Sequence, residues 1–77
     1  MSEPKQLSKE ELKTVMQLRE DRQGAFDDYS NLKKIAKPTT AQERLMKSLK
    51  GTLIDLDARL EEITGVSQDW TKLTPNP

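Results

Sequence analysis

Residues 46–63 read MKSLKGTLIDLDARLEEI, and this stretch decides the fold. Its apolar side chains recur at alternating steps of three and four residues, the spacing of a continuous stripe on a helix that packs against another helix. The stripe predicts a helix over residues 41–64. Gly65 follows where a left-handed residue commonly ends a helix, so residues 65–66 are expected to form the C-terminal cap. The stripe consists of Met46, Leu49, Leu53, Leu56, Leu60 and Ile63.

A second helix is predicted over residues 8–37. Ser8 and Glu11 have the spacing of a capping box, in which each side chain bonds the backbone N–H of the other residue. An apolar stripe follows with the same steps, and Arg22 occupies one place in it. That stripe consists of Val15, Leu18, Ala25, Tyr29, Leu32 and Ala36.

The connection between these helices is expected to be short. Pro38 disfavours helical backbone at the residue before it, and Thr40 with Glu43 offers a second capping box, so the turn is predicted at residues 38–40. Two long helices joined by so few residues must lie antiparallel. The predicted fold is therefore all-α, an antiparallel αα-hairpin with a coiled-coil-like seam.

The register of this hairpin predicts contacts near its middle and at its open end. It places Arg22 near Asp55.

Residues 1–7 are expected to form an N-terminal arm. Residues 67–77 have two prolines at their end and no helical period, so they are expected to form an extended tail, with a short helical turn starting at Ser67 as the alternative. At the start of this tail, Trp70 and Leu73 are expected to close the open end, beside Leu7 and Leu12.

Composition narrows the function. The 77 residues include no Cys and no His, which removes disulfides, thiolate and imidazole catalysis, and most transition-metal sites. Neighbouring carboxylates diverge around a helix, and no glycine-rich phosphate loop occurs. We therefore expect no enzyme, no cofactor, no metal and no small-molecule substrate. No run of about 20 apolar residues occurs, so we also expect no membrane segment and a cytoplasmic location.

A lone hairpin of this size buries only one stripe per helix, and such a core rarely suffices below about 80 residues. We therefore predict a small regulatory accessory protein, an adaptor, inhibitor or assembly subunit, that forms a homo-oligomer or binds a protein partner through its helix-packing surfaces. In the alternative, the register differs and the surplus apolar residues widen the internal core. The predicted partner contacts are Leu12, Met16, Phe26, Tyr29, Ile35, Leu45, Ile54 and Trp70.

Charge suggests a second hypothesis. Thirteen Lys and Arg balance thirteen Asp and Glu, but residues 29–54 carry six basic residues and one glutamate. A basic turn end would suit the phosphate backbone of a nucleic acid. The alternative is an ordinary charged turn exposed to solvent. The residues of this alternative are Lys33, Lys34, Lys37, Arg44, Lys47 and Lys50.

Two glycines lie inside the predicted helices, where each costs about 1 kcal/mol relative to alanine. They are Gly24 and Gly51, and the register places both near the middle of the hairpin. Either they form a waist that lets a side chain of this chain or of a partner approach closely, or the helices tolerate them.

Overall fold

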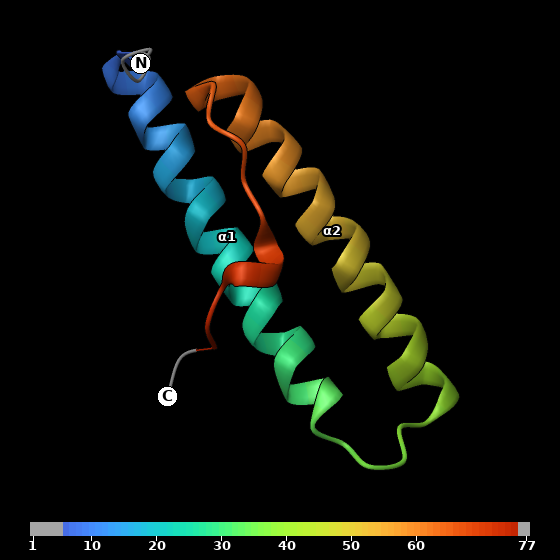
Figure 1. Ribbon diagram of the computed structural model, residues 1–77. Coiled ribbons are helices and arrows are strands. Elements are labelled where there is room, and N and C mark those ends of the chain that lie inside the picture. The colour runs from blue at the N-terminus through green and yellow to red at the C-terminus, as the bar shows by residue number, and fades with distance from the viewer. Residues whose placement is uncertain (1–5, 76–77) are drawn as a thin grey trace.

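The computed structural model describes residues 6–75 as an antiparallel helical hairpin with a C-terminal segment lying along it (Figure 1). Helix α1 spans Lys9–Lys33, helix α2 spans Thr40–Thr64, and a 3-10 turn, η1, spans Trp70–Lys72. No strand occurs within residues 6–75. The predicted all-α hairpin is therefore confirmed.

The start of α1 follows the predicted capping box. The Ser8 hydroxyl accepts a hydrogen bond from the Glu11 backbone N–H at 3.2 Å, and the Glu11 carboxylate accepts one from the Ser8 N–H at 3.1 Å. These bonds satisfy backbone donors that have no partner within the helix. The predicted arm, residues 1–7, lies mostly outside the described residues, and only its last two residues can be placed.

The end of α1 comes earlier than the sequence predicts. The helix ends at Lys33 rather than near Lys37, and residues 34–39 form the connection. The Ile35 N–H donates to the Leu32 carbonyl at 3.1 Å, three residues back instead of four. Such a tightened last turn is a common way for a helix to end. The connection is therefore six residues long, twice the predicted length.

The start of α2 differs by one residue. Thr39, not Thr40, is the N-cap, and its hydroxyl accepts from the Gln42 N–H at 3.2 Å while Gln42 accepts from the Thr39 N–H at 2.8 Å. Two adjacent threonines are each followed three residues later by a side chain that can complete a capping box. The pattern fits both frames, so the sequence could not select between them. The other end agrees with the prediction, because Gly65 caps α2 with a left-handed φ of 72°.

The core lies between the two helices and is thin. The α2 stripe faces α1 as predicted, and Leu53 and Leu60 are fully buried. Phe26 corrects the prediction, since it was expected to be exposed and is only 8% exposed. For this residue the alternative, a wider internal core, is right. The buried apolar residues are Val15, Phe26, Leu53, Leu56 and Leu60.

The C-terminal segment contradicts the predicted closure of the open end. After Gly65 it turns back and runs between α1 and α2 toward the middle of the hairpin (Figure 1). Trp70 packs there against Tyr29, with ring centroids 5.5 Å apart and the rings nearly perpendicular. The Gln23 side chain donates to the Thr74 carbonyl at 3.0 Å, which ties the end of the segment to α1. The tail is thus a third packed element, because aromatic and polar partners lie halfway along the helices.

The two helical glycines have no contact within the chain that requires them. Gly24 and Gly51 are exposed, and a Cβ atom added to either would meet nothing within 4 Å. A waist formed by this chain's own side chains is therefore wrong. Close approach by a partner stays a prediction.

We predict that Gly24→Ala stabilises the protein by about 1 kcal/mol, because alanine has the higher helix propensity and the site is open. In a domain of this size that corresponds to a rise of about 4–8 °C in the midpoint of thermal unfolding, measured by circular dichroism. Gly65→Ala is the matched control and should destabilise by about 1 kcal/mol, since its φ is left-handed. Equal shifts for the two variants would contradict this assignment.

Candidate functional site

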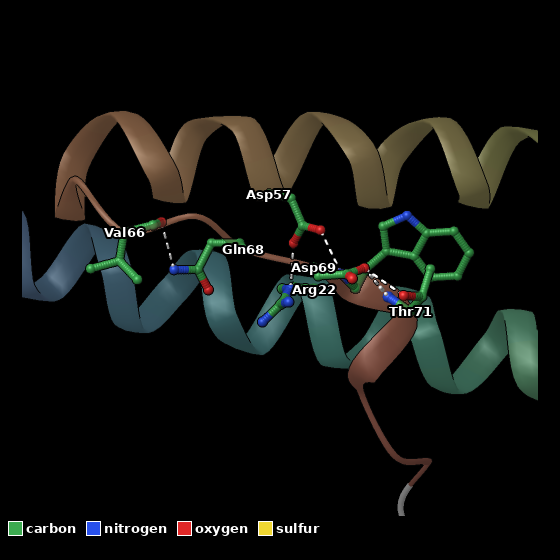
Figure 2. Close-up of polar contacts among 7 residues, drawn as sticks. Arg22, Asp57, Val66, Gln68, Asp69 and Thr71 are labelled. Carbon is green, nitrogen blue, oxygen red and sulfur yellow. Dashed lines mark hydrogen bonds and ion pairs between the residues drawn. The ribbon is translucent and has the colours of Figure 1, made fainter.

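Asp57 joins α1, α2 and the C-terminal segment (Figure 2). Its Oδ1 lies 2.6 Å from Nε of Arg22 on α1, and its Oδ2 accepts a hydrogen bond from the Trp70 backbone N–H at 2.6 Å. Both charged side chains are only 11% exposed. Nε and Oδ1 are close but are not aligned as a hydrogen bond, so the contact is an ion pair. Asp57 therefore holds the segment at the centre of the hairpin.

The sequence anticipated a partner for Arg22 but selected the wrong aspartate. Asp55 faces solvent and pairs with Arg59 one turn along α2, at 3.1 Å, with both side chains 63% exposed. That pairing agrees with the four-residue spacing expected of a surface pair. The usable signal was Arg22 itself, a charged residue in an apolar stripe, which needs a buried opposite charge.

Asp69 shapes the turn that presents Trp70. Its carboxylate accepts hydrogen bonds from the Thr71 N–H at 3.0 Å and from the Thr71 hydroxyl (Figure 2). These bonds favour the charged carboxylate and lower the pKa of Asp69 below its usual value, with further help from the positive charges of Lys72 and Arg22. The turn is therefore stabilised by an ionised N-cap at neutral pH.

Three aromatic rings meet beside a shallow hollow of about 200 Å³. Trp70 contacts Tyr29 and also Phe26, with a centroid distance of 6.3 Å to Phe26. Lys33 borders the hollow, so a positive charge lies next to aromatic surface. The sequence did not predict this arrangement, because Trp70 was assigned to the open end. The hollow is lined by Phe26, Tyr29, Ser30, Lys33, Trp70 and Thr71.

The predicted partner contacts divide into two groups. Phe26 and Tyr29 both pack against Trp70, and the three support the fold. The other five are exposed, from 37% for Ile35 to 63% for Met16. Val66 is equally exposed but is not among the predicted contacts, because its position after Gly65 predicts a role in the cap of α2. The exposed apolar residues are Leu12, Met16, Ile35, Leu45, Ile54 and Val66.

The six basic residues of the second hypothesis are all exposed. Lys33 ends α1, Lys34 and Lys37 lie in the connection, and the other three lie in the first half of α2. Only Lys33 also borders the aromatic hollow. Within residues 6–75, no cluster of three or more acidic side chains could hold a metal ion. No helix in this part of the chain is long and apolar enough to cross a membrane. No protein-family model, curated protein or solved structure matches the chain.

We predict that Asp57→Ala destabilises the protein by about 3 kcal/mol, because it leaves Arg22 buried without its counter-charge and the Trp70 N–H without an acceptor. Trp70 is the only tryptophan, so its fluorescence reports the loss directly as a shift to longer wavelength. Asp57→Asn keeps an acceptor oxygen for only one of the two groups and sets its NH2 donor against the other, so its stability should lie between those of the unchanged protein and Asp57→Ala.

The matched control is Asp55→Ala, which removes an exposed pair on the same helix and should cost about 0.5 kcal/mol or less. An Asp57→Ala protein with unchanged emission and stability would show that the C-terminal segment does not depend on this carboxylate.

Proposed function

We propose that this protein is a non-enzymatic protein-interaction module that acts through the outer surfaces of its helices. The observation that carries the proposal is the number of large apolar side chains left in solvent. Among residues 6–75, six large apolar residues are exposed and five are buried, and the others are half-buried. Single exposed apolar side chains are ordinary on protein surfaces, so the support comes from their number beside so thin a core.

The exposed apolar residues lie on several parts of the hairpin. Leu12 and Met16 lie near the start of α1, Leu45 and Ile54 lie on α2, and Val66 follows α2. They are therefore spread along the outer surfaces instead of forming one misplaced part of the core. The outer surfaces of the helices also stay open to a partner. The C-terminal segment, held by Asp57 beside Arg22, packs against a different side of the hairpin.

A site-specific photo-cross-linker tests this function in the cells that normally make the protein. Placed in turn at Met16, Leu45 and Ile54, it should give discrete adducts at one or more of these positions, because a partner covers part of the exposed apolar surface. Placed at Lys13 or Asn31, which are exposed and polar, it should give few. The mass of each adduct distinguishes a second copy, which doubles the mass of the chain, from another protein. Equal adduct formation at apolar and polar positions would contradict the proposal.

Binding of single-stranded nucleic acid is the second candidate, and the aromatic hollow favours it. A base needs an aromatic face to stack on, and its phosphates need nearby cations. Tyr29 and Trp70 provide aromatic surface, and Lys33 borders the same hollow. The net charge of zero counts against it, since the residues outside 29–54 carry the compensating negative charge and repel a polyanion.

Polarisation of a fluorescent thymidine oligonucleotide tests this candidate. Affinity should fall steeply with salt, and the double variant Lys33→Gln/Lys34→Gln should reduce the logarithmic salt slope by up to about 1.4. Lys9→Gln/Lys13→Gln, at the other end of α1, should leave the slope unchanged. Binding that is absent at low salt, or equally weakened by both double variants, would exclude this candidate.

A further inference from the structure

Helix α2 carries a second stripe, on the side away from its buried one. The exposed residues recur at steps of three, four, three, four and three, the spacing that keeps one face of a helix in contact with a partner helix. In Figure 1 no other described segment covers the flank of α2 that faces away from α1. This outer stripe consists of Arg44, Lys47, Gly51, Ile54, Ala58 and Glu61.

The outer stripe is ordered by size. Its centre holds Ile54, which is 54% exposed, between Gly51 and Ala58. Nothing in this chain lies within 4 Å of a Cβ at Gly51, so the glycine is costly to the helix and serves no internal contact. The large side chain of Ile54 is a knob, and the missing side chain at Gly51 leaves a hole. A knob of the same kind on a second helix would fit this hole.

The outer stripe is also ordered by charge. Its N-terminal half carries Arg44 and Lys47, and its C-terminal half carries Glu61, with Glu62 adjacent. Such a polarity is complementary to itself when a second identical helix runs in the opposite direction. A parallel copy would instead set like charges against each other.

We propose that α2 pairs antiparallel with α2 of a second copy of this chain, through the outer stripe. The proposal rests on the proposed function and names the partner. A two-fold axis between Thr52 and Leu53 places Ile54 of each copy over Gly51 of the other. The same axis sets Arg44 opposite Glu61 and Lys47 opposite Ala58. The product is a closed dimer whose four long helices form one bundle.

The size of the stripe sets the expected affinity. From Arg44 to Glu61 a helix rises by about 26 Å, and a contact one helix wide lies at the small end of specific interfaces. We therefore expect a dissociation constant of about 1–100 μM. A partner of another sequence would need to reproduce both the apolar centre and the charge order, which the chain itself already has.

Analytical ultracentrifugation of the full chain between about 1 μM and 1 mM tests the pairing. The mass should rise from 8.8 kDa toward twice that value. Ile54→Lys should weaken dimerisation at least about tenfold, because it places a charge at the centre of the contact. Leu45→Lys is the matched control, since Leu45 is 50% exposed on the same helix but lies outside the outer stripe.

Charge exchange tests the direction of pairing. Arg44→Glu alone and Glu61→Arg alone should each weaken self-association, because each sets like charges opposite each other twice per dimer. An equal mixture of the two variants should associate again, since both contacts are then complementary. A third sample, the double variant Arg44→Glu/Glu61→Arg, should also dimerise.

Several results would overturn the pairing. One is a chain that stays at 8.8 kDa up to about 1 mM. A mixture that associates no better than its components would exclude the antiparallel register. Cross-linking at Ile54 to a different protein, combined with a monomeric mass, would exclude self-pairing while supporting an interaction function. Absence of adducts at every apolar position would instead count against the function itself.

Discussion

The rest of the structure depends on the carboxylate of Asp57. One of its oxygens meets the Arg22 guanidinium of α1, and the other accepts the Trp70 N–H of the C-terminal segment, while the residue itself belongs to α2. Buried charges are tolerated only when paired, so these contacts select one register of the hairpin and one position of the segment. Two helices with a thin apolar seam would otherwise slide past each other at small cost, because leucines at successive turns are interchangeable.

That same contact leaves α2 free on its outer side. The C-terminal segment packs against α1 and the inner flank of α2, and Trp70 adds aromatic surface to Phe26 and Tyr29. The chain thereby obtains a third element without using the outer stripe. An exposed isoleucine between a glycine and an alanine can then serve association, since the fold does not require it.

The sequence predicted local features well because local chemistry determines them. The capping box at Ser8, the buried stripe of α2 and the left-handed cap at Gly65 each follow from spacings of a few residues. The position of Trp70 did not follow, because it depends on a contact with Asp57 that is set by the register, and the register depends on the connection. An error of three residues in that connection was enough to select Asp55 in place of Asp57. Five of the eight predicted partner contacts are exposed, whereas Phe26, Tyr29 and Trp70 are used inside the fold.

We infer that helix α2 packs with one face against its own chain and with the opposite face against α2 of a second copy. An isotope-filtered nuclear Overhauser measurement tests it most directly, on an equal mixture of labelled and unlabelled chain at about 1 mM, well above the expected dissociation constant. We predict contacts between the Ile54 methyl groups of one copy and the Gly51 α-protons of the other. Dimers that show intermolecular contacts only elsewhere, or a sample with none at all, would contradict the claim.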